Sequence, residues 1–165
     1  MKTILMMCLF AWASALVAQD VPAPAGAEVV LRMGGSGPRP YAAVWIEDAA
    51  GQSIRTLGVW GNKPKHQRSL KAWKAAGGGV DGISGATRPN GDYRMQWDGR
   101  DRQGAPAPAG TYVIRAESAR EEGPHCQVRV TVPYGPTPVR VQSPADQDIL
   151  GLFVRTPVGG AGAPP

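Results

Sequence analysis

The sequence predicts an all-β protein, an antiparallel β-sandwich of about seven strands with one short helix. Apolar residues recur at every second position in several segments, which turns one face of each strand inward and the other toward water. The clearest alternating sets are Tyr93, Met95 and Trp97, then Tyr112, Ile114 and Ala116, and then Val128, Val130 and Val132. Gly and Pro are abundant, at 22 and 16 residues, and supply the turns between such strands.

Three more strands are expected in the first part of the chain, at residues 28–33, 41–47 and 53–60. Residues 48–51 read Asp-Ala-Ala-Gly and are typical of a short hairpin turn between the last two. A seventh strand is expected near residues 139–141 or 150–154.

One segment breaks the two-residue period. Residues 65–77, KHQRSLKAWKAAG, contain good helix formers and end at Gly77, which suits the position after a helix. Leu70 and Trp73 lie three residues apart and would therefore share the face that docks on the sheet. A single short helix is predicted here.

The N-terminus has the pattern of a secretory signal over residues 1–18. Lys2 is followed by an apolar stretch over residues 4–12 and by small residues, with cleavage expected after Ala15 or Ala18. The apolar stretch is too short for a transmembrane helix. An exported protein without stable membrane insertion is therefore expected.

The mature chain is expected to form one domain. Residues 19–27 read as a Pro/Ala linker, residues 28–155 as a single β-sandwich domain, and residues 156–165 as a disordered tail. Removal of the signal leaves one of the 2 cysteines, so no internal disulfide is expected. The net charge of +5 loses only Lys2, and we interpret the remaining basic residues as solvated surface rather than as a nucleic-acid site.

The segment WDGRDRQG, residues 97–104, has the composition of a turn between two strands. Asp98 and Asp101 can accept hydrogen bonds from backbone N–H groups ahead of them, and Gly99 and Gly104 can take positive φ. A cation site on the two aspartates is the alternative, but it needs more oxygen ligands than the turn shows. The segment resembles a turn in Ig-like modules of the flagellar hook-cap scaffolding protein, which implies an Ig-like sandwich.

Residues 41–120 as a whole resemble a family of predicted periplasmic proteins of unknown function. The resemblance rests on YAAVWIEDAAG, RTLGVWG, LKAWK, DGISGATRPNGDY, WDGRDRQGAPAPAGTY and AESARE, in that order. It fades from Pro124 onward. It implies a periplasmic location.

A second resemblance is carried by DGISGAT, residues 81–87, which is similar to the acceptor motif of periplasmic FMN transferases. The same motif occurs in flavin-carrying subunits of sodium-pumping quinone reductases and related electron-transfer complexes. The resemblance implies FMN joined through its phosphate to the Thr87 hydroxyl and donated from FAD by a transferase that uses Mg²⁺. The matching positions are Asp81, Ser84, Gly85, Ala86 and Thr87.

The residue types predict an exposed loop without bulky side chains, which another enzyme can bind. Gly82 and Gly85 let a second surface approach the backbone closely, and Ala86 leaves room for a phosphate beside Thr87. Arg88 can pair with that phosphate. Because a base or metal in the partner must activate the hydroxyl, no catalytic residue is expected in this chain. The alternative is an ordinary Gly-rich connection without a function of its own.

The tryptophans and the basic run near this motif have two interpretations. Trp45, Trp60, Trp73 and Trp97 are expected in the core. Trp60 and Trp73 bracket the predicted helix and are the candidates for stacking on a flavin. The basic run consists of Lys63, Lys65, Arg68, Lys71 and Lys74. We interpret it as a solvated helix face, with electrostatic stabilisation of a reduced, anionic flavin as the alternative.

His125 and Cys126 do not predict a metal site. Adjacent strand residues point to opposite faces, and the only other histidine is His66. Cys126 is expected as a small buried apolar residue. No Ser-His-Asp set, carboxylate pair or CxxC motif supports a hydrolase or a disulfide exchanger.

The preferred hypothesis is a periplasmic electron carrier, not an enzyme, with covalent FMN on Thr87. Its expected partners are a periplasmic FMN transferase and a membrane-bound redox protein. The alternative is a non-redox binding or scaffolding module, because a sandwich fold does not by itself define a function.

Overall fold

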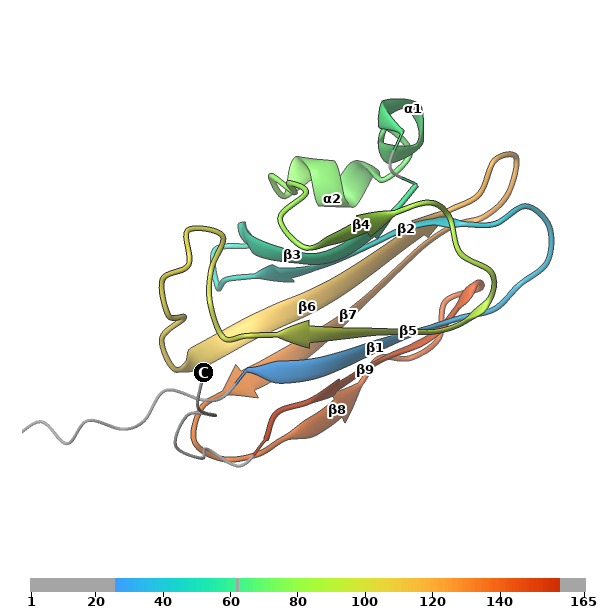
Figure 1. Cartoon of the computed structure of the whole chain (residues 1–165). Helices are drawn as coiled ribbons and strands as arrows, with labels where there is room; N and C mark the ends of the chain where they lie inside the picture. Colours follow the sequence, from blue (N-terminus) through green and yellow to red (C-terminus); the bar gives the residue numbers. More distant parts are fainter. Residues whose placement is uncertain (1–25, 62, 158–165) are drawn as a thin grey trace, which may run out of the picture.

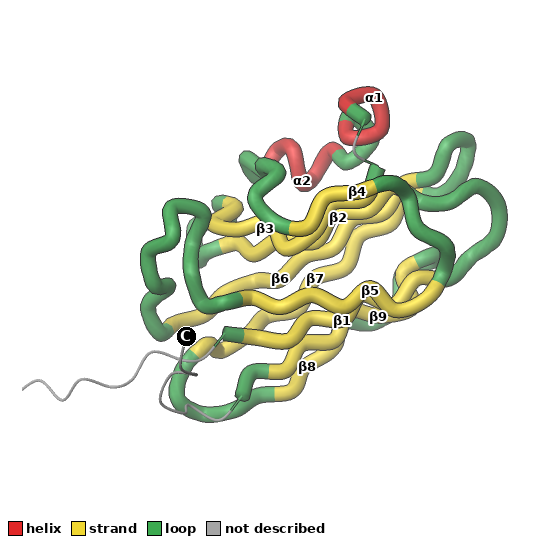
Figure 2. Tube along the Cα trace, viewed as in Figure 1, coloured by secondary structure: helices red, strands yellow, loops and turns green. Residues whose placement is uncertain are grey.

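The computed structural model describes residues 26–61 and 63–157, which form two β-sheets packed face to face with two short helices on one outer side (Figure 1, Figure 2). The predicted all-β sandwich is confirmed. The described part of the chain has nine strands rather than seven, because short strands form at the edge of each sheet.

The smaller sheet has four strands, all paired antiparallel. In spatial order they are β5 (Gly91–Trp97), β1 (Ala27–Met33), β9 (Ile149–Arg155) and β8 (Arg140–Gln142). Both candidate positions for the last predicted strand are therefore strands, and they pair with each other.

The larger sheet has five strands, and its first pair is parallel. In spatial order they are β4 (Ile83–Gly85), β3 (Ser53–Trp60), β2 (Tyr41–Glu47), β6 (Gly110–Ala119) and β7 (His125–Tyr134). The predicted hairpin between β2 and β3 is confirmed: Asp48 Oδ1 accepts the N–H groups of Ala50 and Gln52 at 2.9 and 3.0 Å, and Gly51 has a φ of +77°.

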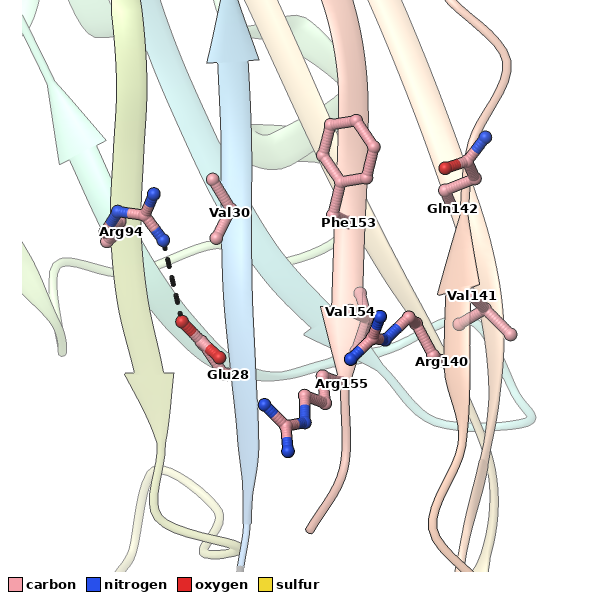
Figure 3. Close-up of a pocket in the computed structure, with 9 residues that line it drawn as sticks. All are labelled: Glu28, Val30, Arg94, Arg140, Val141, Gln142, Phe153, Val154 and Arg155. Atoms are coloured by element: carbon pink, nitrogen blue, oxygen red, sulfur yellow. Dashed lines mark ion pairs between the residues drawn. The ribbon is translucent and has the colours of Figure 1, made fainter.

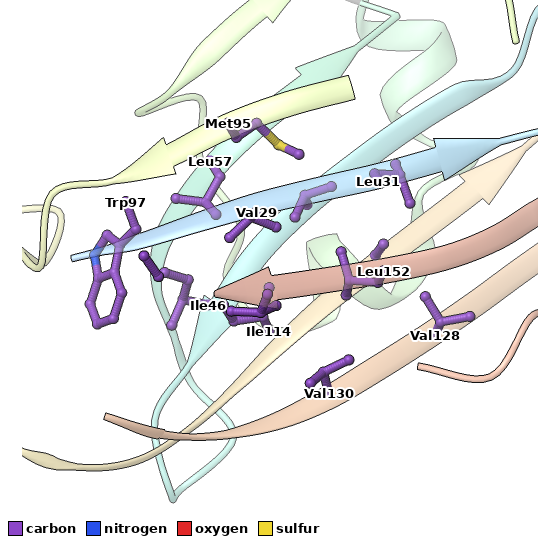
Figure 4. Close-up of a cluster of buried hydrophobic side chains, with 14 of the residues drawn as sticks. Val29, Leu31, Ile46, Leu57, Met95, Trp97, Ile114, Val128, Val130 and Leu152 are labelled. Carbon is purple, nitrogen blue, oxygen red and sulfur yellow. The ribbon is translucent and has the colours of Figure 1, made fainter. Parts of the chain in front are cut away.

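The main core lies between the two sheets (Figure 4). The alternation seen in the sequence places every second residue of β5, β6 and β7 in it, as predicted. Its larger members include Leu31, Ile46, Trp97, Ile114 and Leu152, all at most 1% exposed. The one cysteine that the structure describes, Cys126, is free, so burial of such apolar surface is the main stabilising contribution among these residues.

A second, smaller core explains why β2 is buried on both faces. Val44 and Ile46 face the main core, whereas Ala43 and Trp45 face the helices on the other side of the sheet. Trp73 joins Trp45 there, and its indole Nε1–H donates to the Thr56 hydroxyl at 3.0 Å. The helices therefore cover one face of the larger sheet.

The prediction of one helix over residues 65–77 was wrong in one respect, because the chain forms two: α1 (Pro64–Gln67) and α2 (Lys71–Ala75). The break falls at Leu70, whose ψ of +72° is not helical and whose buried side chain packs in the second core. The expected docking of Leu70 and Trp73 is confirmed, and Gly77 lies just after α2, as expected, with a positive φ.

A buried carboxylate from a distant strand fixes the start of α2. Glu117 on β6 is fully buried and accepts the N–H groups of Ala72 and Trp73 at 3.0 and 2.9 Å. These donors belong to the first helical turn and have no partner within the helix. His125 Nε2 contacts the same carboxylate. This long-range cap holds the helix against the sheet.

The ends of the domain differ slightly from the predicted bounds. Ala27 is already buried in β1, and Thr156 is buried with its hydroxyl accepting the Val139 N–H at 2.8 Å. The predicted signal over residues 1–18, most of the linker and most of the tail lie outside the described residues. No helix in the described part of the chain is long and apolar enough to span a membrane.

Replacing Glu117 by Ala should destabilise the fold by about 1–3 kcal/mol, because two buried N–H groups lose their acceptor. Urea denaturation measures the free energy of unfolding. Glu117→Gln keeps one acceptor oxygen and should lose less. Arg39→Ala changes an exposed side chain in the loop before β2 and should leave stability unchanged. A Glu117→Ala protein as stable as the original chain would contradict this role.

Candidate functional site

The DGISGAT segment lies at the free edge of the larger sheet. Its central residues form β4, and the chain then crosses to β5 at the edge of the other sheet (Figure 1). The sequence predicted an exposed loop here. The structure corrects this in part, because three residues of the motif are a parallel edge strand beside β3.

Asp81 anchors the start of the motif to β3. Its two carboxylate oxygens lie 3.2 and 3.1 Å from the backbone nitrogen of Thr56, and Arg102 Nε lies 3.3 Å from Oδ2. The carboxylate is mostly buried, with 14% of the side chain exposed. Asp81 therefore binds groups of this chain and has a role in the fold.

The two motif glycines differ in their surroundings. A Cβ on Gly82 would lie 2.2 Å from the Thr56 carbonyl oxygen and 2.6 Å from that of Leu57, so no side chain fits between the segment and β3. A Cβ on Gly85 would meet nothing within 4 Å. Gly82 is needed for the close approach of two backbones, whereas Gly85 is not required by the fold.

The outer edge of β4 carries exposed groups. Its inner edge pairs with residues 58–60 of β3, and the Gly61 N–H donates to the Gly85 carbonyl at 2.9 Å. Ser84 is exposed. Val80 and Ile83 are 53% and 52% exposed, which is unusual for large apolar side chains. An approaching protein would meet both an unpaired strand edge and an apolar surface here.

Thr87 follows the strand and is half-buried. Its hydroxyl makes no hydrogen bond with any residue that the structure describes. A hydroxyl with no protein partner and partial exposure is open to a reagent or enzyme from outside. Ala86, immediately before it, is exposed and adds no bulk beside the hydroxyl.

The chain behind Thr87 is held by Tyr93. Its phenol O–H is shared between the carbonyl oxygens of Arg88 and Pro89, at 2.9 and 3.0 Å. Burial raises the pKa of Tyr93, so the phenol stays protonated and remains a donor at neutral pH. Asn90 Nδ2 adds a hydrogen bond to the Gly35 carbonyl at 2.6 Å. Hydrogen bonds thus fix the chain before Thr87, at Asp81, and after it, at residues 88–90.

Arg88 lies over two buried aromatic rings. Its guanidinium carbon is 4.8 Å from the ring centroid of Tyr93 and 5.9 Å from that of Trp60. The side chain has no acidic partner among the described residues, and the residue is exposed. It therefore offers a positive charge with a defined position one residue after the Thr87 hydroxyl.

The tryptophans are core residues, as expected. Trp60 and Trp73 are 2% and 0% exposed. Trp60 packs edge-on against Tyr93 with centroids 4.7 Å apart, and Gly78 leaves room for the Trp73 indole. Neither ring has an open face, so the predicted stacking on a flavin receives no support. All members of the basic run are exposed, in accord with a solvated face.

Two further expectations concern residues away from the motif. Cys126 is fully buried, and burial raises the pKa of its thiol, in agreement with a small apolar core residue. Across residues 26–61 and 63–157, no group of three His, Cys, Asp or Glu side chains is placed to hold a metal ion. Asp98 and Asp101 accept backbone N–H groups, and Gly99 and Gly104 have positive φ, which confirms the predicted turn.

Sequence reasoning missed a buried arginine, Arg120, that contacts the loop after the motif. Arg120 pairs with Asp148 and donates to the carbonyls of Gly34 and Pro38 and to the amide oxygen of Asn90. It joins three loops at one end of the sandwich, including the loop that leads from Thr87 into β5. No pattern in the sequence marks this arginine, because its partners are distant along the chain.

The fold and motif together define a two-sheet β-sandwich that presents a segment of small residues at one sheet edge. A family model described as "Predicted periplasmic protein (DUF2271)" matches residues 30–149, and the chain belongs to this family of predicted periplasmic proteins of unknown function. No curated protein and no solved structure matches the chain. The family resemblance seen in the sequence is confirmed at this level, but the expectation that it fades from Pro124 onward was wrong, because the match extends to residue 149.

The two motif glycines give a matched pair of variants. Gly82→Ala should destabilise the protein by about 1–3 kcal/mol, because the new methyl group collides with the backbone of β3. Gly85→Ala should leave the free energy of unfolding within about 0.5 kcal/mol of the original value. Thermal or urea denaturation compares them, and equal stability of the two variants would show that β4 does not lie against β3.

Proposed function

We propose that this protein carries FMN in phosphoester linkage on Thr87 and passes electrons between redox partners in the periplasm. It acts as a carrier rather than as an enzyme. The observation that supports this most is the Thr87 hydroxyl, which has no partner among the described residues and lies between two anchored ends of an edge segment. The similarity of DGISGAT to a flavin acceptor motif supplies the identity of the group.

The attachment step is a transfer that needs no residue of this chain to act as a base. The Thr87 oxygen forms a bond to the FMN phosphorus of FAD, and the bond from that phosphorus to the bridging pyrophosphate oxygen breaks. AMP leaves, and the hydroxyl proton passes to a base of the transferase. A magnesium ion in the transferase offsets the charge of the phosphates.

The described residues fit the phosphate end of such a group. Arg88 has no acidic partner and can bind the phosphoester, which retains one negative charge. Ala86 leaves the space beside it open. Once bound, FMN supplies one- and two-electron transfer, and the protein supplies placement. The buried Trp60 and Trp73 do not fit a stacking role, so we assign the ring system no partner from these two residues.

The proposal requires two kinds of partner. A periplasmic FMN transferase must bind the segment, and the unpaired edge of β4 with exposed Val80 and Ile83 offers it a surface. A membrane protein must connect the flavin to an electron supply in the cytoplasm.

Intact-mass measurement tests the proposal directly. Co-expression with a periplasmic FMN transferase should add the mass of FMN less one water, together with flavin fluorescence of the denatured chain in a gel. Thr87→Ala should abolish both signals, whereas Thr131→Ala, at an exposed site on β7, should change neither.

Gly85→Ala separates recognition from folding, because the structure leaves open space at this position. We expect a folded protein with reduced modification. An unmodified original chain, in cells where the transferase modifies another acceptor, would contradict the proposal. That result would favour a non-redox binding or scaffolding module.

A further inference from the structure

The outer face of the smaller sheet contains a groove of about 390 Å³, whereas the motif strand β4 belongs to the other sheet. Three arginines and one glutamate line it, together with apolar side chains of β1 and β9 (Figure 3). Concave surfaces of this size that combine apolar area with a few polar groups are typical of small-molecule sites. The flavin proposal makes no use of this surface.

On one side of the groove, the positive and negative side chains form ion pairs. Arg94 on β5 lies 3.6 Å from the Glu28 carboxylate on β1 (Figure 3). It also lies 3.4 Å from the Asp92 carboxylate. The only acid that lines the groove is therefore engaged by a neighbouring arginine. Glu28 also lies directly opposite Arg155 across β1 and β9, but its ion pair is with Arg94 and not with Arg155.

The other side carries two arginines without acidic partners. Arg140 on β8 and Arg155 on β9 are direct cross-strand neighbours, and both are exposed. Neither makes an ion pair or hydrogen bond with any other described residue. Like charges directly opposite each other destabilise an antiparallel pair. In Figure 3 both guanidinium groups extend from their strands in the direction of β1.

An apolar floor lies beside this pair. Val30 and Phe153 are cross-strand neighbours on β1 and β9, and both are half-buried. The Arg32 guanidinium lies 5.2 Å from the Phe153 ring centroid and is fixed by a hydrogen bond to Asp92 at 2.8 Å. Phe153 lies two residues before Arg155 on β9, so the floor is the next position on the same face of the sheet.

From this arrangement we infer a binding site for a small organic acid on the outer face of the smaller sheet. Its carboxylate lies between Arg140 and Arg155, and its apolar body lies on Val30 and Phe153. Two adjacent guanidinium groups can share one carboxylate through charge-assisted hydrogen bonds. The bound anion would remove the repulsion between them. The volume and the presence of only two unpaired arginines favour a small molecule over an acidic protein surface.

Benzoate is a suitable probe because it combines one carboxylate with one apolar ring. Titration followed by backbone amide NMR should shift signals of Val30, Gln142, Phe153 and Arg155. Benzyl alcohol has the ring without the charge and should bind at least about ten-fold more weakly. Inorganic phosphate should shift only residues near the two arginines.

Two variants test the assignment on folded protein. Arg140→Gln and Arg155→Gln should each weaken benzoate binding about ten-fold or more and should raise the melting temperature, because the like-charge pair is removed. Arg39→Gln, at an exposed arginine in the loop before β2, should leave binding and melting temperature unchanged.

Three outcomes would contradict the proposed binding site. Benzoate shifts spread over the whole surface would do so, as would equal binding of benzoate and phosphate. Binding of an acidic peptide without binding of benzoate would assign the groove to a protein partner instead. These outcomes are independent of whether Thr87 carries FMN.

Discussion

The Asp81 carboxylate and the backbone of β3 form the contact on which the candidate site depends. Both carboxylate oxygens lie within hydrogen-bonding distance of the Thr56 N–H, and Gly82 then passes so close to β3 that no Cβ fits. A carboxylate is a strong acceptor for a backbone donor, and a glycine removes the steric barrier to strand addition. Together they turn a Gly-rich stretch into an ordered edge strand.

This contact divides the motif into two halves with different roles. Asp81 and Gly82 are required by the fold itself. Gly85 and Thr87 are not, because the first has open space around it and the hydroxyl of the second has no partner in the described chain. Residue types that the fold does not require are those that an external partner can select. The second half of the motif is therefore where we expect recognition by a modifying enzyme.

Much of the fold followed from local patterns. Alternation placed β5, β6 and β7, and turn chemistry placed the hairpin after Glu47 and the turn after Trp97, because these signals depend on neighbouring residues. The break between the helices did not follow, because the acceptor for the α2 N–H groups is Glu117, more than forty residues away. Parallel pairing of β4 was equally invisible, because it depends on Thr56 and Gly82 meeting in space.

The sequence named the residues of the candidate site, but it did not predict how they are arranged. The motif identified Thr87, and the structure adds the anchor from Tyr93 and the placement of Arg88 over its ring. The stacking role suggested for two tryptophans came from their position in the sequence, which does not reveal that both rings are covered. The arginine pair on the smaller sheet was missed because Arg140 and Arg155 are adjacent only across strands.

The most direct measurement is the location of the flavin within the chain purified from the cells that make it. Arg88 precedes Pro89, where trypsin does not cut, so digestion yields residues 75–94 as one peptide that contains both Ser84 and Thr87. Fragmentation of this peptide should place FMN on Thr87. A flavin on Ser84, or a peptide without FMN in cells that contain an active transferase, would contradict the account.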